Sequence, residues 1–311
     1  MLFADAGYSV AMFDVEESQL DKAKNQISIN YNMLKENGLL NGTQSIESRM
    51  ALMSFTSDFE EALTDAFYVQ ECVPEILELK QKVFKRFDES EAIAKTGDVV
   101  LASSCSTMPI SMISSEMKKR NLSIIVHPVN PVFYLKVVEI VPAEFTDAKI
   151  TETARQVMQN IGRSPVVCRK EVKGFAVNRI QYAIISEAWH LVNDGVLEPE
   201  EVDTVMSEGL GPRYAFFGPW EVTLLNAPNG TMDYCQRYSK GAKAVIDTFK
   251  PPAAWEPDHP TTQRIAKQME KRVSTEHLND LRNLRDQYLQ GVCKLKSAMD
   301  KEKMIKKWKT D

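Results

Sequence analysis

The pattern of apolar and polar residues divides the chain into two halves of different character. In the first half, short apolar runs of strand length alternate with longer segments in which apolar residues recur at helical spacing. The strand-like runs lie at 8–13, 67–73, 99–105, 122–128 and 136–142, and the helical segments lie at 17–38, 75–94 and 146–162. Such alternation is typical of βαβ units, so residues 1–172 are expected to form an α/β domain around a mostly parallel sheet.

After residue 172 the strand-like runs stop and helical patterns take over. Helices are predicted at 174–195, 198–211, 233–249 and 277–299, with a proline-rich connector at 251–260. Gly38 and Gly195 each follow a helical pattern, in the place where glycine commonly ends a helix. Residues 173–311 are therefore expected to form an all-α domain.

The first residues bear on the kind of α/β domain. The segment MLFADAG is typical of a helix end with Gly7 behind it, and the strand at 8–13 leads directly to Asp14. In a Rossmann-like dinucleotide-binding sheet, an acid at the tip of the second strand binds the adenosine ribose and disfavours a 2′-phosphate. An Asp before a helix is also a common N-cap, so that alternative stays open. Because the sequence contains no Gly-x-Gly-x-x-Gly loop, we expect a Rossmann-like domain without its first strand and phosphate loop.

Composition narrows the functional class. The 311 residues are 43% hydrophobic and 26% charged, with a formal net charge of −5, as in an ordinary globular protein. No apolar run reaches the roughly 18 residues of a membrane span, and the acidic balance makes nucleic acid an unfavourable partner. The five cysteines are scattered and lack metal-ligand spacing, which favours a reduced, cytoplasmic setting and no metal site.

Four polar residues stand where such a sheet places its chemistry. His127 ends the run LSIIVHP, Glu139 lies in the next run, Ser106 follows the run VVLASSC, and Asn178 opens the first long helix of the second half. A His paired with a Glu is an oriented base, and Ser and Asn side chains can hold a substrate oxygen. A His beside a proline can also be a structural turn residue, but the four together favour catalysis.

Several segments resemble the 3-hydroxyacyl-CoA dehydrogenase family over essentially the whole chain. The matching segments are ECVPEILELKQKVF, ASSCSTMP, HPVNP, VVEIVP, KEVKGFAVNRIQYAIISEAW and MSEGLGPRYAFFGP. They look most like the lambda-crystallin and L-gulonate 3-dehydrogenase branch, for which IQYAIISEAW and SEGLGPRYAFFGP are specific. The resemblance implies an NAD-dependent enzyme, a homodimer through the helical domain, and oxidation of a small hydroxy acid, with L-gulonate as the best candidate.

The resemblance also implies roles for single residues. His127 would be the catalytic base, Glu139 its orienting acid, and Ser106 and Asn178 would bind the substrate hydroxyl. On the cofactor side, the residues implied to contact NAD are Asp14 at the ribose, Asn130 beside the nicotinamide, Glu75 and Lys80. Two other functions remain open, which are a 3-hydroxyacyl-CoA dehydrogenase and a non-catalytic, crystallin-like or truncated structural protein.

The carboxylate of a small hydroxy acid needs a cation. Arg213 in GLGPRY is the candidate, because a guanidinium binds a carboxylate with two parallel hydrogen bonds. An interface role is equally compatible with its position. The aromatic residues that follow it are expected in the core or a subunit interface, and His190, His259 and His277 have no evident chemical partner.

Overall fold

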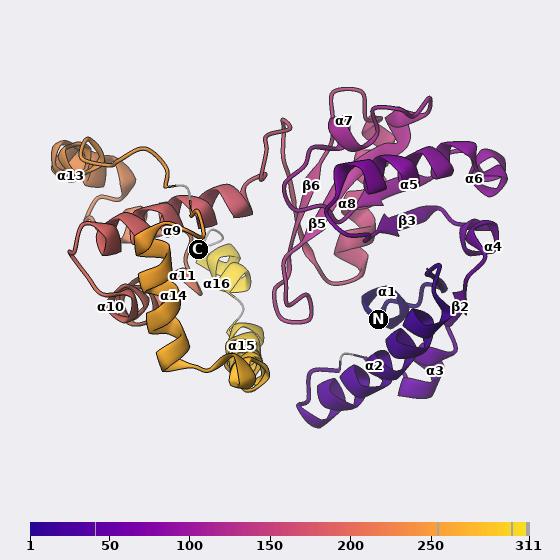
Figure 1. The fold of residues 1–311 in the computed structure, drawn as a ribbon, viewed down its shortest axis with the longest axis horizontal. Coiled ribbons are helices and arrows are strands. Elements are labelled where there is room, and N and C mark those ends of the chain that lie inside the picture. The colour runs from indigo at the N-terminus through magenta and orange to yellow at the C-terminus, as the bar shows by residue number, and fades with distance from the viewer. Residues whose placement is uncertain (41, 254, 300, 309–311) are drawn as a thin grey trace. The chain divides into compact units, whose positions relative to one another are not determined.

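The computed structural model describes residues 1–40, 42–253, 255–299 and 301–308, and it divides into two compact units (Figure 1). Unit 1 is Met1–Arg179 and unit 2 is Ile180–Asp311. Every strand of the described residues lies in unit 1, and unit 2 is helical. The expected order, an α/β domain followed by an all-α domain, is confirmed.

The strands of unit 1 form two sheets. In the smaller sheet β1 (Val10–Phe13) pairs in parallel with β2 (Met53–Thr56). The larger sheet has the order β3-β4-β5-β6-β7, formed by β3 (Tyr68–Glu71), β4 (Val100–Ser103), β5 (Ser123–Pro128), β6 (Val137–Val141) and β7 (Ser164–Val167). All of its pairs are parallel except β5 with β6, which run antiparallel. The sheet is therefore mostly parallel, as predicted.

The core of unit 1 explains why the apolar runs become strands. All residues of β4 are buried, and Ile124, Ile125 and Val126 of β5 are at most 1% exposed. Strands buried on both faces have continuous apolar sequences rather than alternating ones. The runs at 99–105 and 122–128 have this character, so their prediction follows directly from burial.

Helices of unit 1 surround these sheets. They are α1 (Leu2–Asp5), α2 (Glu17–Glu36), α3 (Ile46–Met50), α4 (Phe59–Leu63), α5 (Leu77–Glu89), α6 (Glu91–Thr96), α7 (Ile110–Ile113), the short η1 (Arg120–Leu122) and α8 (Ala148–Asn160). The helix predicted at 75–94 is two helices, because Ser90 has extended backbone and its hydroxyl accepts a hydrogen bond from Ile93 N, which caps α6.

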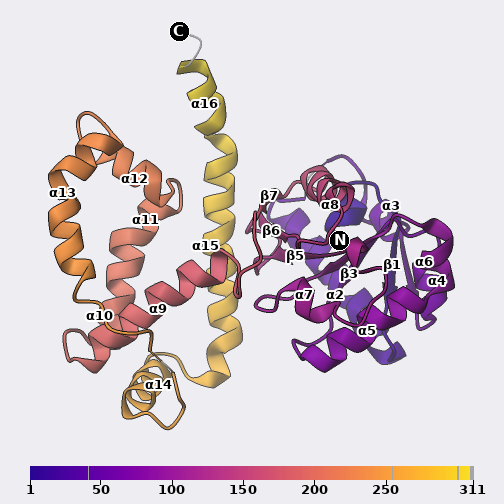
Figure 2. The same ribbon diagram turned by 90° about the horizontal axis from the view of Figure 1, so that it is seen from above.

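Unit 2 is made of helices, and its α-helices are labelled in Figure 2 from α9 to α16. They are α9 (Val177–Asn193), whose first turn belongs to unit 1, α10 (Pro199–Thr204), the π-helix η2 (Val205–Leu210), α11 (Gly211–Tyr214), α12 (Pro219–Leu225), α13 (Thr231–Ile246), α14 (Pro260–Arg272), η3 (Thr275–His277), α15 (Leu278–Ala298) and α16 (Lys301–Trp308). Among the described residues no helix is both long and apolar enough to cross a bilayer.

Candidate active site

His127 and Glu139 form a buried pair across two neighbouring strands. In the antiparallel register of β5 and β6 they stand directly opposite, so their side chains share one face of the sheet. His127 Nδ1 lies 2.9 Å from Glu139 Oε2, and the two residues are 7% and 1% exposed. A carboxylate only accepts hydrogen bonds, so in the neutral imidazole the proton is on Nδ1, which faces Glu139, and Nε2 keeps a free lone pair. The pair is a base with a fixed tautomer.

The second oxygen of Glu139 accepts hydrogen bonds from backbone amides at the start of helix α9. Glu139 Oε1 accepts hydrogen bonds from Ala176 N at 2.7 Å and Val177 N at 2.9 Å. Burial acts to raise the pKa of the Glu139 carboxyl, but the hydrogen bonds from His127, Val177 and Ala176 outweigh it and hold that pKa below its ordinary value. Glu139 is therefore an anion that faces the imidazole.

A tight turn delivers these backbone amides. Gly174 has a φ of +73° and Phe175 a φ of +50°, so the backbone turns through the left-handed region before α9 begins. A positive φ is rare for a bulky residue and is found where the surroundings enforce it. Phe175 is 1% exposed, and its ring centroid lies 5.8 Å from that of His127. Burial of this ring holds the turn that points the amides at Glu139.

Ser106 and Asn178 also lie together. Asn178, in the first turn of α9, donates from Nδ2 to the backbone oxygen of Ser106 at 2.8 Å. Gly174 N donates to Thr107 O at 3.1 Å, which fastens the loop after β4 to the same turn. Within the described residues the Ser106 hydroxyl has no hydrogen-bond partner, so it is free to meet an oxygen of a bound molecule. The four residues predicted to carry chemistry therefore share one cluster in unit 1.

Glu75 holds the loop that carries Ser106. Its Oε1 accepts hydrogen bonds from Thr107 N at 3.0 Å, Thr107 Oγ1 at 2.6 Å and Cys105 Sγ at 3.2 Å. Burial acts to raise the pKa of the Glu75 carboxyl, and the hydrogen bonds from Thr107 and Cys105 lower it to a net value below the ordinary one. The resemblance implied an NAD contact for Glu75, and the structure gives this carboxylate partners on the Ser106 loop.

Lys80 lies in a buried ion pair that sequence reasoning missed. It is 2% exposed, and its ammonium lies 2.8 Å from Glu71 Oε1 and 3.0 Å from Val73 O. Ser103 Oγ donates to Glu71 Oε2 at 2.6 Å and completes the network. The carboxylate of Glu71 in the predicted strand at 67–73 was the available signal, because a buried charge requires a partner. The network fixes the segment between β3 and α5, which carries Glu75.

Asp14 and Asn130 are the other predicted cofactor residues. Asp14 directly follows β1, and its Oδ1 accepts a hydrogen bond from Glu16 N at 3.0 Å. The N-cap of α2 is Glu16, so Asp14 shapes the turn before the helix. Its Oδ2 accepts no hydrogen bond from the described residues, which fits a carboxylate that binds ribose hydroxyls. Asn130 is exposed and precedes the cis peptide bond to Pro131.

Arg213 lies in unit 2 on α11. Pro212 lacks the N–H that a continuous helix needs there, and the helix before it widens to the π-helix η2. Gly211 permits this junction, because a Cβ on it would lie 2.7 Å from Met206 O. Arg213 is exposed, and its guanidinium carbon lies 5.6 Å from the centre of the Tyr214 ring. No acidic side chain of the described chain pairs with it.

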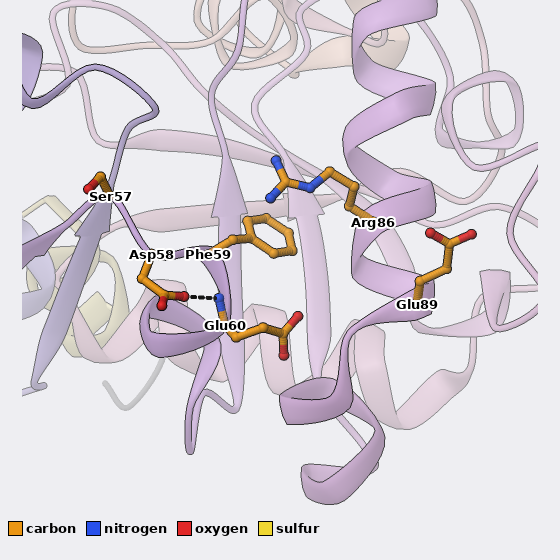
Figure 3. Close-up of a pocket in the computed structure, with 6 residues that line it drawn as sticks. All are labelled: Ser57, Asp58, Phe59, Glu60, Arg86 and Glu89. Carbon is orange, nitrogen blue, oxygen red and sulfur yellow. Dashed lines mark hydrogen bonds between the residues drawn. The ribbon is translucent and has the colours of Figure 1, made fainter.

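A hollow of about 560 Å³ lies elsewhere in unit 1, beside α4 and α5 (Figure 3). Three of its charged side chains, Asp58, Glu60 and Arg86, already have partners within the protein. Asp58 caps α4 by accepting from Glu60 N, the Glu60 carboxylate accepts from Ser90 Oγ at 2.9 Å, and the Arg86 guanidinium lies 3.9 Å from the Phe59 ring centre. None of the predicted site residues lines this hollow.

Comparison with known proteins places this geometry in a family. The family model described as "3-hydroxyacyl-CoA dehydrogenase, NAD binding domain" matches residues 1–172, and the model of the C-terminal domain of that family matches residues 174–255. The lambda-crystallin homolog of Homo sapiens is 40% identical over 301 residues, which are 96% of this chain and 92% of that protein. The L-carnitine dehydrogenase of Staphylococcus epidermidis is 32% identical over 226 residues, or 73% of this chain and 68% of that protein.

A solved structure agrees with these matches. The crystal structure of 5-formyl-3-hydroxy-2-methylpyridine 4-carboxylic acid 5-dehydrogenase, described as an NAD⁺-dependent dismutase, superimposes with a TM-score of 0.77 at 25% identity. The match covers 94% of this chain and 92% of that one. The chain therefore belongs to the 3-hydroxyacyl-CoA dehydrogenase family, in its lambda-crystallin branch, and is an NAD-dependent oxidoreductase.

Proposed function

We propose that this protein oxidises L-gulonate at carbon 3, with NAD as the acceptor and His127 as the base. The observation that carries the proposal is the buried contact of 2.9 Å between His127 Nδ1 and Glu139 Oε2, which leaves Nε2 to accept a proton. The choice of L-gulonate rests on the resemblance of residues 180–189 and 207–219 to the L-gulonate 3-dehydrogenase branch.

In the proposed reaction His127 Nε2 takes the proton of the substrate hydroxyl. The Glu139 anion stabilises the imidazolium that forms, and the Ser106 hydroxyl and Asn178 position the substrate oxygen. When bound, NAD supplies the acceptor for the hydride that leaves the substrate carbon. The protein contributes position and proton transfer.

Residues of this chain are proposed to contact NAD at both ends of the cofactor, the adenosine ribose and the nicotinamide. The unpartnered Oδ2 of Asp14 would accept hydrogen bonds from the adenosine ribose, and the exposed Asn130 would lie beside the nicotinamide. Glu75 and Lys80 match NAD-contacting positions by resemblance, and their own hydrogen bonds shape the loops next to that site. The sequence contains no glycine-rich loop for the pyrophosphate.

Arg213 is proposed to bind the carboxylate of the substrate. Its guanidinium is exposed and has no acidic partner among the described residues, so its hydrogen-bonding capacity is unused. A guanidinium recognises a carboxylate with two parallel hydrogen bonds, whereas an acyl-CoA would need a channel for its pantetheine arm.

We also propose a homodimer formed through unit 2, and a cytoplasmic location. Trp220, Leu225, Met232 and Tyr288 are 79%, 64%, 72% and 70% exposed, and a dimer interface would cover apolar side chains of this kind. The five cysteines are free thiols, which suits a reducing compartment. Sedimentation equilibrium of the protein and of Trp220→Glu tests the dimer, which is expected to dissociate in the variant.

Comparing two substrates tests the proposed reaction. NADH formation from L-gulonate is expected to give a kcat/KM at least tenfold above that from 3-hydroxybutyryl-CoA, and Arg213→Met is expected to remove most of the difference by raising KM for L-gulonate. A preference for the CoA thioester would support the acyl-CoA alternative. Absence of turnover with both, in protein shown to bind NAD, would support a structural role.

A further inference from the structure

The side chain of Gln70 links three strands of the larger sheet. Gln70 lies on β3, and its Nε2 donates to Ser104 Oγ, just after β4, at 2.7 Å, and to Val126 O on β5 at 3.0 Å. Its Oε1 accepts the hydroxyl of Tyr68 at 2.5 Å. Both amide hydrogens are therefore used, and the tyrosine fixes which way the amide faces.

The link replaces a missing rung of the sheet. The parallel pairing of β4 with β5 ends at Ser103 and Ile125, so Val126 lies one residue beyond it. The next available backbone donor, Cys105 N, bonds to Ser103 Oγ at 3.2 Å instead. Val126 O would lack a partner on this side, and an unpaired carbonyl in a buried strand is costly. Gln70 supplies the donor by reaching across β4 from β3.

The two residues that accept hydrogen bonds from Gln70 lie next to residues of the candidate site. Val126 directly precedes His127, and Ser104 lies two residues before Ser106. One rigid amide thus sets the distance between the strand that carries the base and the loop that carries the serine. A polar side chain inside a sheet costs stability unless its hydrogen bonds are made, so the amide of Gln70 is explained by the bonds that it forms.

We propose that Gln70 is a positioning residue for the dehydrogenase reaction, which holds His127 through Val126 and the Ser106 loop through Ser104. This inference rests on the proposed function. It assigns Gln70 no contact with substrate or cofactor. Its effect is geometric, and displacement of reacting groups by about 1 Å is enough to cost on the order of 100-fold in rate.

The substitution Gln70→Leu removes both donors at similar volume. We expect kcat to fall at least tenfold while the Kd for NAD, measured by titration, stays within twofold. Gln81 offers a matched control, because its Nε2 also donates to a backbone oxygen and a serine hydroxyl, Met112 O and Ser115 Oγ, both at 3.0 Å. Gln81→Leu is expected to leave kcat unchanged. An unchanged kcat in Gln70→Leu, or an equal loss in both variants, would overturn the proposal.

A second background separates positioning from general damage. If Gln70 acts in part through His127, then Gln70→Leu costs less in a His127→Gln protein than in the parent protein, because only the Ser106 loop is left for it to position. The same fold loss in both backgrounds would contradict the proposal. If His127→Gln itself leaves turnover unchanged, the proposed function fails. If His127→Gln lowers turnover and Gln70→Leu does not, only the positioning role fails.

One readout does not depend on turnover. The chain has four histidines, so imidazole NMR signals can be assigned by substitution. Gln70→Leu is expected to shift the signals of His127 and to leave those of His190, His259 and His277 in place, whereas unshifted His127 signals would refute the link. Should Gln70→Leu fail to fold, Gln70→Met keeps the unbranched shape without the donors and carries the same tests.

Discussion

Replacing the Glu139 carboxylate by an amide sets two hydrogen-bonding needs against each other. Glu139 accepts on both oxygens, from His127 Nδ1 at 2.9 Å on one side and from Ala176 N at 2.7 Å and Val177 N at 2.9 Å on the other. Glutamine has only one accepting end. If its oxygen faces the backbone amides, its NH₂ group faces His127 and forces the imidazole proton onto Nε2. The base then lacks the Nε2 lone pair that must accept the substrate proton. If its oxygen faces His127, the amides lose their partner.

Either arrangement has a cost that can be bounded. A hydrogen bond to a charged group contributes about 1.5–3 kcal/mol, and each 1.36 kcal/mol changes a rate about tenfold. Glu139→Gln is therefore expected to lower kcat about 10- to 150-fold, and to lower the free energy of unfolding by about 1–3 kcal/mol because Glu139 is 1% exposed.

Steady-state NADH formation and urea unfolding measure the two effects on one preparation. Glu152→Gln is a suitable control, because Glu152 is on α8 and its carboxylate pairs with Arg155 at the surface. That variant is expected to match the parent in kcat and nearly in stability. A Glu139→Gln protein with unchanged kcat and unchanged unfolding free energy would show that the contact between Glu139 and His127 matters for neither.

Two further results are expected. Asp14→Ala should weaken NAD binding and reduce the preference of the protein for NAD over NADP. If the parent protein uses NADP as well as NAD, then the role of Asp14 is limited to the turn that it forms with Glu16. Folding lowers the pKa of Glu139, so the contribution of this carboxylate to stability is full above the ordinary value of 4.5 and is lost as pH falls from 4.5 through the lower folded value. Urea titrations should therefore show that the parent protein loses stability below pH 4.5 more steeply than Glu139→Gln. Parallel stability curves for the two proteins would contradict this expectation.

The larger elements were predictable because burial leaves a simple mark on sequence. The fully buried strands β4 and β5 are continuous apolar runs, and α2 is followed by Gly38 at a φ of +67°. Two strands were missed. β2 (MSFT) and β7 (SPVV) are four residues each, partly exposed, and contain polar residues or proline, so neither gives a clear period. Their formation depends on a neighbouring strand that sequence periodicity does not reveal.

The candidate site was predictable as a set of residues but not as a geometry. The expectation that His127 and Glu139 meet assumed strand ends of a parallel sheet, whereas they meet as an antiparallel cross-strand pair. The left-handed turn at Phe175 and the hydrogen bonds of the Gln70 side chain depend on tertiary packing, so the local sequence does not predict them. Roles toward substrate and NAD remain predictions.

In the proposed reaction His127 removes the hydroxyl proton as the substrate is oxidised. The most direct test compares NADH formation from L-gulonate by the parent protein and by His127→Gln, with the Kd for NAD measured on both. His127→Gln is expected to lower kcat by about 10² to 10⁴, the range for loss of a general base, with little change in NAD affinity. Near-normal turnover by His127→Gln would contradict it.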